Sequence, residues 1–182
     1  PPYSNDIYSE ISFVELMLDS LLPNSIGIAI VPVNAVSART KKHNDNNDFK
    51  ERILNKNKLL ASIEMPKNLF YPKGTETIVL VFETGKPNTG NETWFAKFDD
   101  GFDLIKHQKT RTKGEKSEAL YKEFLAKYEE RIESKTSFNK EVNFKDQWVY
   151  TLFSEEEYEV QVADLQKTTN EYISYLFKNQ YI

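Results

Sequence analysis

The first three residues, Pro1-Pro2-Tyr3, are of types that could hold a small flat ligand against the backbone. A carbonyl followed by proline lies on a rigid chain, because proline fixes its own φ angle, and it can accept a hydrogen bond. A tyrosine ring nearby offers a flat face for stacking. The tripeptide is equally compatible with a polyproline-like start or with a ligand for a small proline-binding domain.

A second candidate is the turn-rich segment Asn68–Thr77, which carries the adjacent aromatic residues Phe70 and Tyr71. Neighbouring residues on an extended segment point to opposite sides, so at most one of the two rings faces a bound ligand. The alternative is that both rings pack in the core or against the end of a sheet.

Two groups of cations are candidates for contact with a polyanion. The first follows an apolar strand-like run and comprises Arg39, Lys41 and Lys42. The second comprises Lys106, Lys109, Arg111 and Lys113, in a segment (104–116) whose only acidic residue is Glu115. Both groups suit contact with DNA phosphates, and both are also compatible with a solvated surface.

Composition excludes several classes of site. The 182 residues include no Cys and two His, which excludes a disulfide framework, a thiolate metal site, a cysteine nucleophile and a multi-histidine metal site. We therefore predict no metal. No apolar run approaches the ~20 residues that span a bilayer, and the N-terminus lacks the pattern of a signal peptide. We expect a cytoplasmic protein without a membrane partner.

Hydrophobic periodicity indicates alternating helices and strands. Apolar spacings of three and four predict a helix over 13–22, capped by Ser12. The run 26–33 is apolar at odd and at even positions alike, as expected for a strand covered on both faces in a parallel sheet. Further expected elements are a helix over 49–55 capped by Asp48, strands over 59–65, 78–83 and 92–98 (the last at a sheet edge), helices over 118–132 and 165–177, and a short aromatic segment over 148–153.

The order of these elements predicts an α/β fold. Only a short turn-rich segment separates 59–65 from 78–83, too short for a helical crossover, so these strands should be antiparallel. We expect the back half of a doubly wound, Rossmann-like sheet with an antiparallel edge pair over residues 1–105, and a helical extension over residues 106–182.

Three features in order carry a resemblance to a known family: Pro1-Pro2-Tyr3, then the strand Gly27–Val33 (GIAIVPV), then Met65–Thr77 (MPKNLFYPKGTET). This set resembles the adenine-specific (N6) DNA methyltransferases of restriction–modification systems, in particular the modification subunits of type I systems. Those enzymes carry Asn/Asp-Pro-Pro-Tyr at the end of a central strand. The resemblance covers residues 1–105 and is looser beyond; the Asn68–Thr77 match is its most specific part.

The resemblance implies a role in transferring a methyl group from S-adenosylmethionine to the amino group of a flipped-out adenine. In the family, Pro1 and Pro2 correspond to the carbonyl acceptor, Tyr3 to a stacking residue, and Phe70 or Tyr71 to a second aromatic that closes the pocket. The chemistry agrees, because the lone pair of that amino nitrogen is delocalised and the base must leave the duplex to react.

The chain departs from the family in three places. It lacks the Asn or Asp that precedes Pro1 in the motif, a Gly-rich loop after a first strand, and the acidic residue that holds the cofactor's ribose. We therefore expect S-adenosylmethionine to be bound mainly by an N-terminal half outside this sequence, and this chain to be inactive alone.

The resemblance also implies partners: double-stranded DNA, a sequence-reading specificity subunit and a restriction subunit, with the tail 118–182 as a place for subunit contact. Two alternatives remain open. One is a non-catalytic nucleic-acid or protein-binding module derived from a methyltransferase. The other is a protein glutamine-amide methyltransferase, a class that also uses Asn-Pro-Pro-Tyr.

Overall fold

A computed structural model describes residues 9–37 and 43–153, together with the single positions 169, 172 and 178. Pro1–Tyr3, the cations at 39, 41 and 42, and most of the predicted helix 165–177 lie outside the described residues. The elements are α1 (Glu10–Asp19), β1 (Ile26–Pro32), η1 (Val33–Ala35), α2 (His43–Lys56), β2 (Asn57–Glu64), β3 (Thr77–Thr84), β4 (Glu92–Lys97), β5 (Phe102–Ile105), η2 (Lys106–Gln108), β6 (Thr110–Lys113), α3 (Ser117–Glu130), β7 (Ser137–Glu141) and α4 (Tyr150–Phe153).

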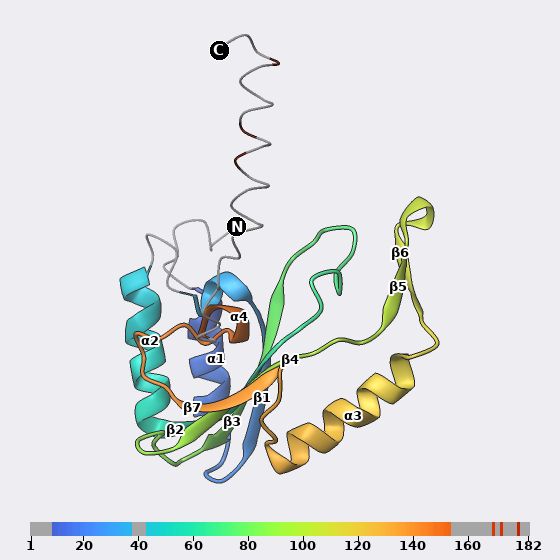
Figure 1. Ribbon diagram of the computed structural model, residues 1–182. Helices are drawn as coiled ribbons and strands as arrows, with labels where there is room; N and C mark the ends of the chain where they lie inside the picture. The colour runs from blue at the N-terminus through green and yellow to red at the C-terminus, as the bar shows by residue number, and fades with distance from the viewer. Residues whose placement is uncertain (1–8, 38–42, 154–168, 170–171, 173–177, 179–182) are drawn as a thin grey trace.

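Five strands form one sheet in the order β1-β3-β2-β4-β7 (Figure 1). Strand β3 runs antiparallel to both β1 and β2, which confirms the antiparallel pair predicted from the short connection. Strand β4 runs parallel to β2, and β7 closes the far side antiparallel to β4. The carboxyl ends of β1, β2 and β4 therefore lie along the same edge of the sheet.

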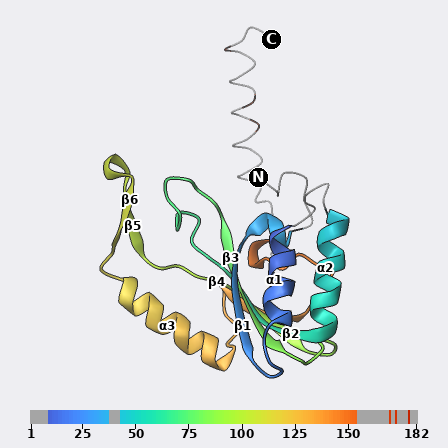
Figure 2. The same ribbon diagram turned by 180° about the vertical axis from the view of Figure 1, so that it is seen from behind.

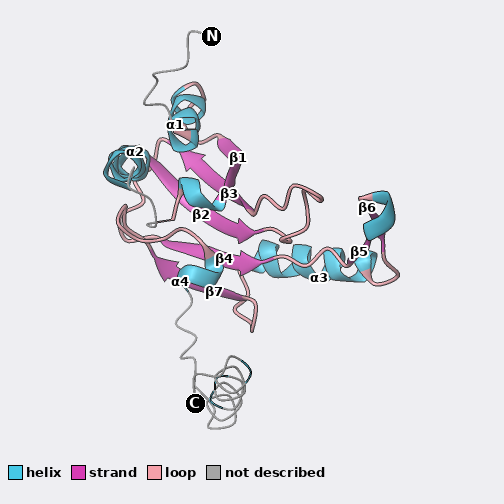
Figure 3. Cartoon of the chain, turned by 90° about the horizontal axis from the view of Figure 1, so that it is seen from above, coloured by secondary structure: helices cyan, strands magenta, loops and turns pink. Residues whose placement is uncertain are grey.

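Helices α1 and α2 cover one face of this sheet, and α3 covers part of the other (Figure 3). The first face holds the larger core, in which Ile11, Leu18 and Ile53 pack against residues of β2 and β3. Each fully buried aliphatic side chain contributes ~1.5–3 kcal/mol of transfer free energy. A Cβ on Gly27 of β1 would lie 2.6 Å from a methyl carbon of Leu18, so glycine allows α1 to approach β1 closely.

On the opposite face, aromatic side chains of α3 pack against β4. Rings of Phe124 and Tyr128 each lie 5.7 Å from the ring of Trp94, which is buried. The Trp94 indole also donates to the carbonyl of Ile132 at 3.1 Å, just beyond the helix. These contacts fix α3 over the β4 half of the sheet and leave the β1 half uncovered.

Strand β1 differs from the expectation of burial on both faces. It lies at the edge of the sheet, where it pairs with β3 alone (Figure 2). Its side chains Ile26, Ile28 and Ile30 are 54%, 59% and 61% exposed. Its other face contacts α1, and a groove of about 340 Å³ follows the junction, lined by residues that include Phe13 and Met17. The prediction of two-sided burial is wrong for this chain because α3 does not reach β1.

Both predicted helix caps are wrong. Helix α1 begins at Glu10, so its cap is Ser9, and the Ser12 hydroxyl instead donates to the carbonyl of Ser9 within the first turn. Helix α2 begins at His43, which places Asp48 inside the helix. In α1 the buried Ile11, three residues before Val14, extends the apolar pattern toward the N-terminus, whereas in α2 polar residues ahead of the apolar pattern continue the helix and periodicity does not detect them.

Strand β4 is internal rather than at the edge, because β7 pairs with its outer side. Residues 137–141 (SFNKE) contain one apolar residue, so their sequence carries no strand signal. The segment 106–153 thus contributes a strand to the main sheet, and its Trp148 and Val149 belong to the larger core. Within the described residues, this segment therefore contains strands as well as the predicted helix.

Lys50 of α2 anchors this later segment to the core. Its side chain is 1% exposed, and its ammonium donates to the carbonyl oxygens of Asp146 at 2.6 Å and Val36 at 3.4 Å. It also lies 5.0 Å from the ring centroid of Trp148. Burial lowers the pKa of Lys50 from 10.5 to about 8, and the negative charge of Asp146, which acts to raise this pKa, offsets only part of the effect.

Candidate functional site

The candidate site lies at the end of the sheet where β1, β2 and β4 finish. Ligands of open α/β sheets bind at the carboxyl ends of strands. Helix α1 begins at this end, and two projections rise from it: the loop between β2 and β3, and the β5–β6 hairpin that follows β4 (Figure 1). Described residues from three separate parts of the sequence therefore meet at one end of the molecule.

The loop between β2 and β3 is built from successive turns. Its base continues the strand ladder through the Met65 amide, which donates to the Thr77 carbonyl at 3.0 Å. Further along, the amides of Leu69, Tyr71 and Lys73 each donate to the carbonyl three residues earlier, at 2.9–3.1 Å. These local hydrogen bonds give the loop a defined shape without packing its tip on the body.

The two aromatic residues of this loop have different surroundings. Phe70 is 46% exposed, whereas Tyr71 is half-buried. The ring of Phe70 is therefore the more accessible of the two, and the role predicted for either ring stays a prediction. An ion pair between Lys67 and Glu76 at 3.2 Å links the two arms of the loop, and the Val33 amide of η1 donates to the Glu76 carbonyl at 3.0 Å, which ties the loop to the segment after β1.

The second projection is a two-stranded hairpin that sequence reasoning described only as a basic turn. Strands β5 and β6 pair antiparallel from Phe102–Lys113 at the base to Ile105–Thr110 at the tip. Strand β5 is only four residues long and its three apolar side chains are partly exposed, so periodicity gave little signal; the alternation of Thr110-Arg111-Thr112-Lys113 was the clue present. The cations predicted to meet DNA lie on this hairpin, but in two different settings.

Arg111 lies opposite Leu104, next to the tip pair, but its side chain reaches back to the base and is engaged with the protein itself. Its guanidinium donates to both carboxylate oxygens of Asp100 at 2.7 Å and lies 5.2 Å from the ring centroid of Phe102. Lys113 lies 3.5 Å from the carboxylate of Glu118 on α3. Lys106 and Lys109, by contrast, are exposed at the tip, and no acidic side chain in the described part of the chain pairs with either.

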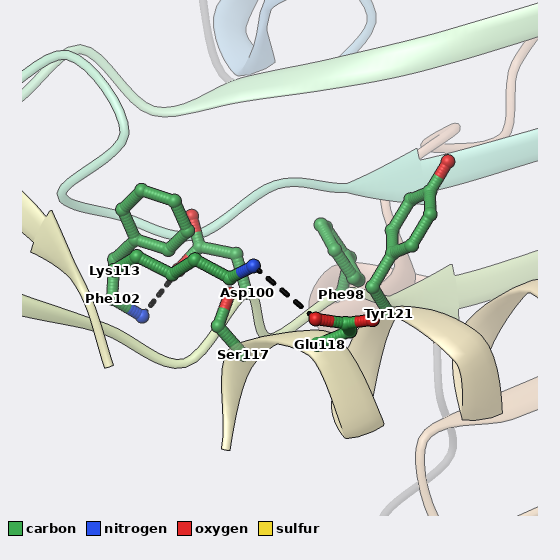
Figure 4. A pocket seen from close by; sticks show the side chains of 7 residues that line it. All are labelled: Phe98, Asp100, Phe102, Lys113, Ser117, Glu118 and Tyr121. Atoms are coloured by element: carbon green, nitrogen blue, oxygen red, sulfur yellow. Dashed lines mark hydrogen bonds and ion pairs between the residues drawn. The ribbon is translucent and has the colours of Figure 1, made fainter. Parts of the chain in front are cut away.

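An open hollow of about 310 Å³ lies between the hairpin base and the start of α3. Figure 4 shows its aromatic lining of Phe98, Phe102 and Tyr121 and the Lys113–Glu118 pair at its rim. No residue of the Phe70 loop lines the hollow, and the residues that border it hold the hairpin in place. We therefore interpret it as part of the packing that supports the hairpin.

Within the described ranges, no group of three or more His, Asp or Glu side chains is placed to hold a metal ion. No described helix is long and apolar enough to cross a membrane.

The sequence profile of the N-6 DNA methylase family matches residues 2–175. The chain belongs to this family. Among curated proteins, none matches the sequence.

Solved structures with a similar fold come from restriction–modification enzymes. A protein assigned as a modification subunit of a type I restriction enzyme from Vibrio vulnificus YJ016 matches with a TM-score of 0.57 and 17% identity, over 77% of this chain and 29% of that one. A chain from a type I restriction–modification system matches with the same TM-score and identity, over 96% and 39%. The type IIG restriction endonuclease BpuSI matches with a TM-score of 0.50 and 12% identity, over 78% and 16%.

At these identities the similarity establishes the fold, which is a partial methyltransferase fold with a mostly antiparallel sheet. The family and the fold class expected from the sequence are confirmed. This N-6 DNA methylase chain spans only 16–39% of the length of the three similar proteins named above.

Proposed function

We propose that this chain is the base-holding part of an adenine-specific DNA methyltransferase in a restriction–modification system. The enzyme transfers a methyl group from S-adenosylmethionine to the amino group of an adenine flipped out of double-stranded DNA. The observation that carries the proposal is the exposed ring of Phe70, held on a turn-built loop at the carboxyl end of the sheet in a chain of the N-6 DNA methylase family.

In this proposal, different residues contact different parts of the flipped adenine. Phe70 stacks on one face of the flipped adenine, since base–aromatic stacking is worth ~1–3 kcal/mol and needs an accessible ring. Tyr3 stacks on the other face, and the backbone of Pro1 and Pro2 presents a carbonyl to the amino hydrogens. Pro1–Tyr3 lie outside the described residues; in the sequence they come six residues before α1, which begins at the same end of the sheet as the Phe70 loop.

The methyl donor requires more than the described part of this chain. The buried carboxylate at the carboxyl end of the described sheet, Glu64, accepts from the amide of Thr151 at 3.0 Å and from its hydroxyl at 2.6 Å, and so is already engaged. These residues do not by themselves fit an adenosyl group. S-Adenosylmethionine is therefore held mainly by the remainder of the catalytic domain, and the isolated chain is inactive.

The open edge of β1 also supports the proposal that this chain packs against the remainder of the catalytic domain. A soluble domain rarely leaves three isoleucines exposed in a row beside an apolar groove, because such a surface favours association. The backbone of β1 is free to pair with a further strand, and Ile26, Ile28 and Ile30, on the sheet face opposite α1, are positioned to be covered by an element that packs on that face. The rest of the methyltransferase domain is the partner we propose for this edge.

Assembly with a specificity subunit and a restriction subunit completes the proposed activity, which belongs in the cytoplasm, where the enzyme meets DNA. The similar chain from a type I restriction–modification system supports this choice of partners.

The test is methyl transfer by the complete enzyme with substitutions at the two loop aromatics. Phe70→Ala should lower kcat/KM by about 5- to 150-fold, the equivalent of ~1–3 kcal/mol of lost stacking. Phe70→Tyr, which keeps a stacking ring, should retain most activity. If Tyr71→Ala is the damaging change and Phe70→Ala is harmless, the stacking assignment is wrong.

A further inference from the structure

The tip of the β5–β6 hairpin is exposed and positively charged, and it suits contact with a partner molecule. Strands β5 and β6 form a separate two-stranded sheet, and such ribbons are marginally stable unless they pack on something. The hairpin is secured at its base, where a Cβ on Gly114 would lie 2.2 Å from the Gly101 carbonyl oxygen and where Arg111 pairs with Asp100. Beyond that base, residues 106–110 are all exposed.

One residue at the tip departs from local conformational preference. Lys109 has a φ of 50°, in the left-handed region that favours glycine or asparagine. Arg131 has a similar φ of 53°, and its guanidinium lies 4.0 Å from the ring centroid of Tyr128. Lys109 makes no such contact in the described part of the chain. A cation thus occupies the position that ends the hairpin turn, and its side chain is exposed at the tip.

We propose that residues Lys106–Lys109 form a DNA-contacting tip that enters a groove of the duplex beside the flipped base. This rests on the proposed function, in which DNA is the substrate. Lys106 and Lys109 contact phosphates on either side, and the Gln108 amide faces base edges between them. The major groove, about 12 Å wide, admits a two-stranded ribbon.

The location of the hairpin supports DNA over a protein partner. The hairpin and the Phe70 loop rise from the same end of the sheet, so a duplex that delivers a base to Phe70 runs past this end (Figure 1). The tip offers Lys106 and Lys109 and no acidic residue, which complements a polyanion.

Arg111 has a different role, as a positioning residue. Its side chain is largely covered, and Asp100 already neutralises its charge through two 2.7 Å hydrogen bonds. The ion pair and the ring of Phe102 fix the angle at which the hairpin leaves the body. Loss of this pair should misdirect the tip without removing a phosphate contact.

The experiment measures binding of the complete enzyme to a fluorescein-labelled duplex by anisotropy, between 50 and 200 mM NaCl. The test variant is Lys106→Gln with Lys109→Asn, because asparagine suits the left-handed backbone and keeps the turn. Loss of two phosphate contacts should reduce the slope of log K against log[salt] by about 1.8, and affinity by at most about 60-fold at 0.1 M salt. The matched control, Lys56→Gln with Lys86→Gln, removes the same charge at the opposite end of the sheet and should leave the slope unchanged.

Arg111→Gln should weaken binding without changing the slope, and the exchanged pair Asp100→Arg with Arg111→Asp should restore affinity. A slope reduced by about 0.9 in Arg111→Gln would instead make Arg111 a phosphate contact and overturn its positioning role. If the tip variant keeps the parental slope while the enzyme still methylates DNA, the tip proposal is wrong and the proposed function stands. If no form of the enzyme binds or methylates DNA, the proposed function itself fails.

Discussion

Replacing Lys50 with methionine should change how the stability of the protein depends on pH. Lys50 is 1% exposed, and burial lowers its pKa from 10.5 to about 8. Between these two pH values the unfolded chain binds a proton that the folded chain does not. Stability therefore rises with pH across that window, because the slope of the unfolding free energy follows the excess of protons bound by the unfolded state.

The size of the effect follows from the two pKa values. The interval between 10.5 and about 8, at ~1.4 kcal/mol per pH unit, corresponds to about 3 kcal/mol. The parent protein should gain up to that amount relative to Lys50→Met between pH 8 and pH 10.5. Removing the ammonium also takes one hydrogen bond from the carbonyls of Asp146 and Val36, although the Trp148 amide still donates to Val36; this cost does not vary with pH.

Urea denaturation of both proteins at several pH values, followed by tryptophan fluorescence, gives the difference in unfolding free energy. Lys56→Met, which removes an exposed lysine from the same helix, controls for the loss of a charge. A difference between parent and Lys50→Met that stays flat or falls as pH rises from 8 would refute the assignment of a buried, weakly basic Lys50.

Two further substitutions test the open edge and the second core. Ile28→Asp should shift the stability of this chain alone by less than ~0.5 kcal/mol, since the side chain is 59% exposed. In the complete enzyme, where the edge is covered, it should lower the melting temperature markedly; equal small shifts in both forms would contradict coverage of β1. Trp94→Ala should cost ~3–5 kcal/mol in urea denaturation, because it empties the space beneath α3. Tyr121→Ala, on the exposed side of that helix, is the control, and a comparable loss there would be evidence against this packing.

The sequence predicted the strands of the main sheet best where apolar side chains alternate or run continuously. The strands expected over 59–65, 78–83 and 92–98 appear within about two residues of β2, β3 and β4. Strand β7 was missed because its pairing with β4 depends on backbone hydrogen bonds, and Phe138 is its only apolar side chain. Backbone pairing of this kind leaves no periodic signal in the sequence.

The exposure of β1 has a related explanation. Continuous apolar residues at 26–33 predict cover on both faces, and the described residues provide cover on one. Apolar periodicity indicates that a face is to be covered, but it does not say which element covers it. The three exposed isoleucines fit our proposal that another part of the catalytic domain packs on that face.

The candidate site was predictable only in part. Phe70 and Tyr71 were predicted through the resemblance of residues 68–77 to a family motif; the structure adds that Phe70 is the more exposed of the two, and its role stays a prediction. The separate roles of Arg111 and Lys109 could not be predicted, because the Asp100–Arg111 pair depends on the fold of the hairpin. Pro1–Tyr3 lie outside the described residues, and their roles remain predictions.

The most direct measurement of the central claim is the chemical identity of the methylated product. The complete enzyme that contains this chain would be incubated with duplex DNA and isotopically labelled S-adenosylmethionine, and the DNA would be digested to nucleosides for mass spectrometry. We expect label in N6-methyladenine, strongly reduced by Phe70→Ala and retained by Phe70→Tyr. Label found in protein glutamine instead, or DNA labelling that is indifferent to Phe70→Ala, would contradict the account.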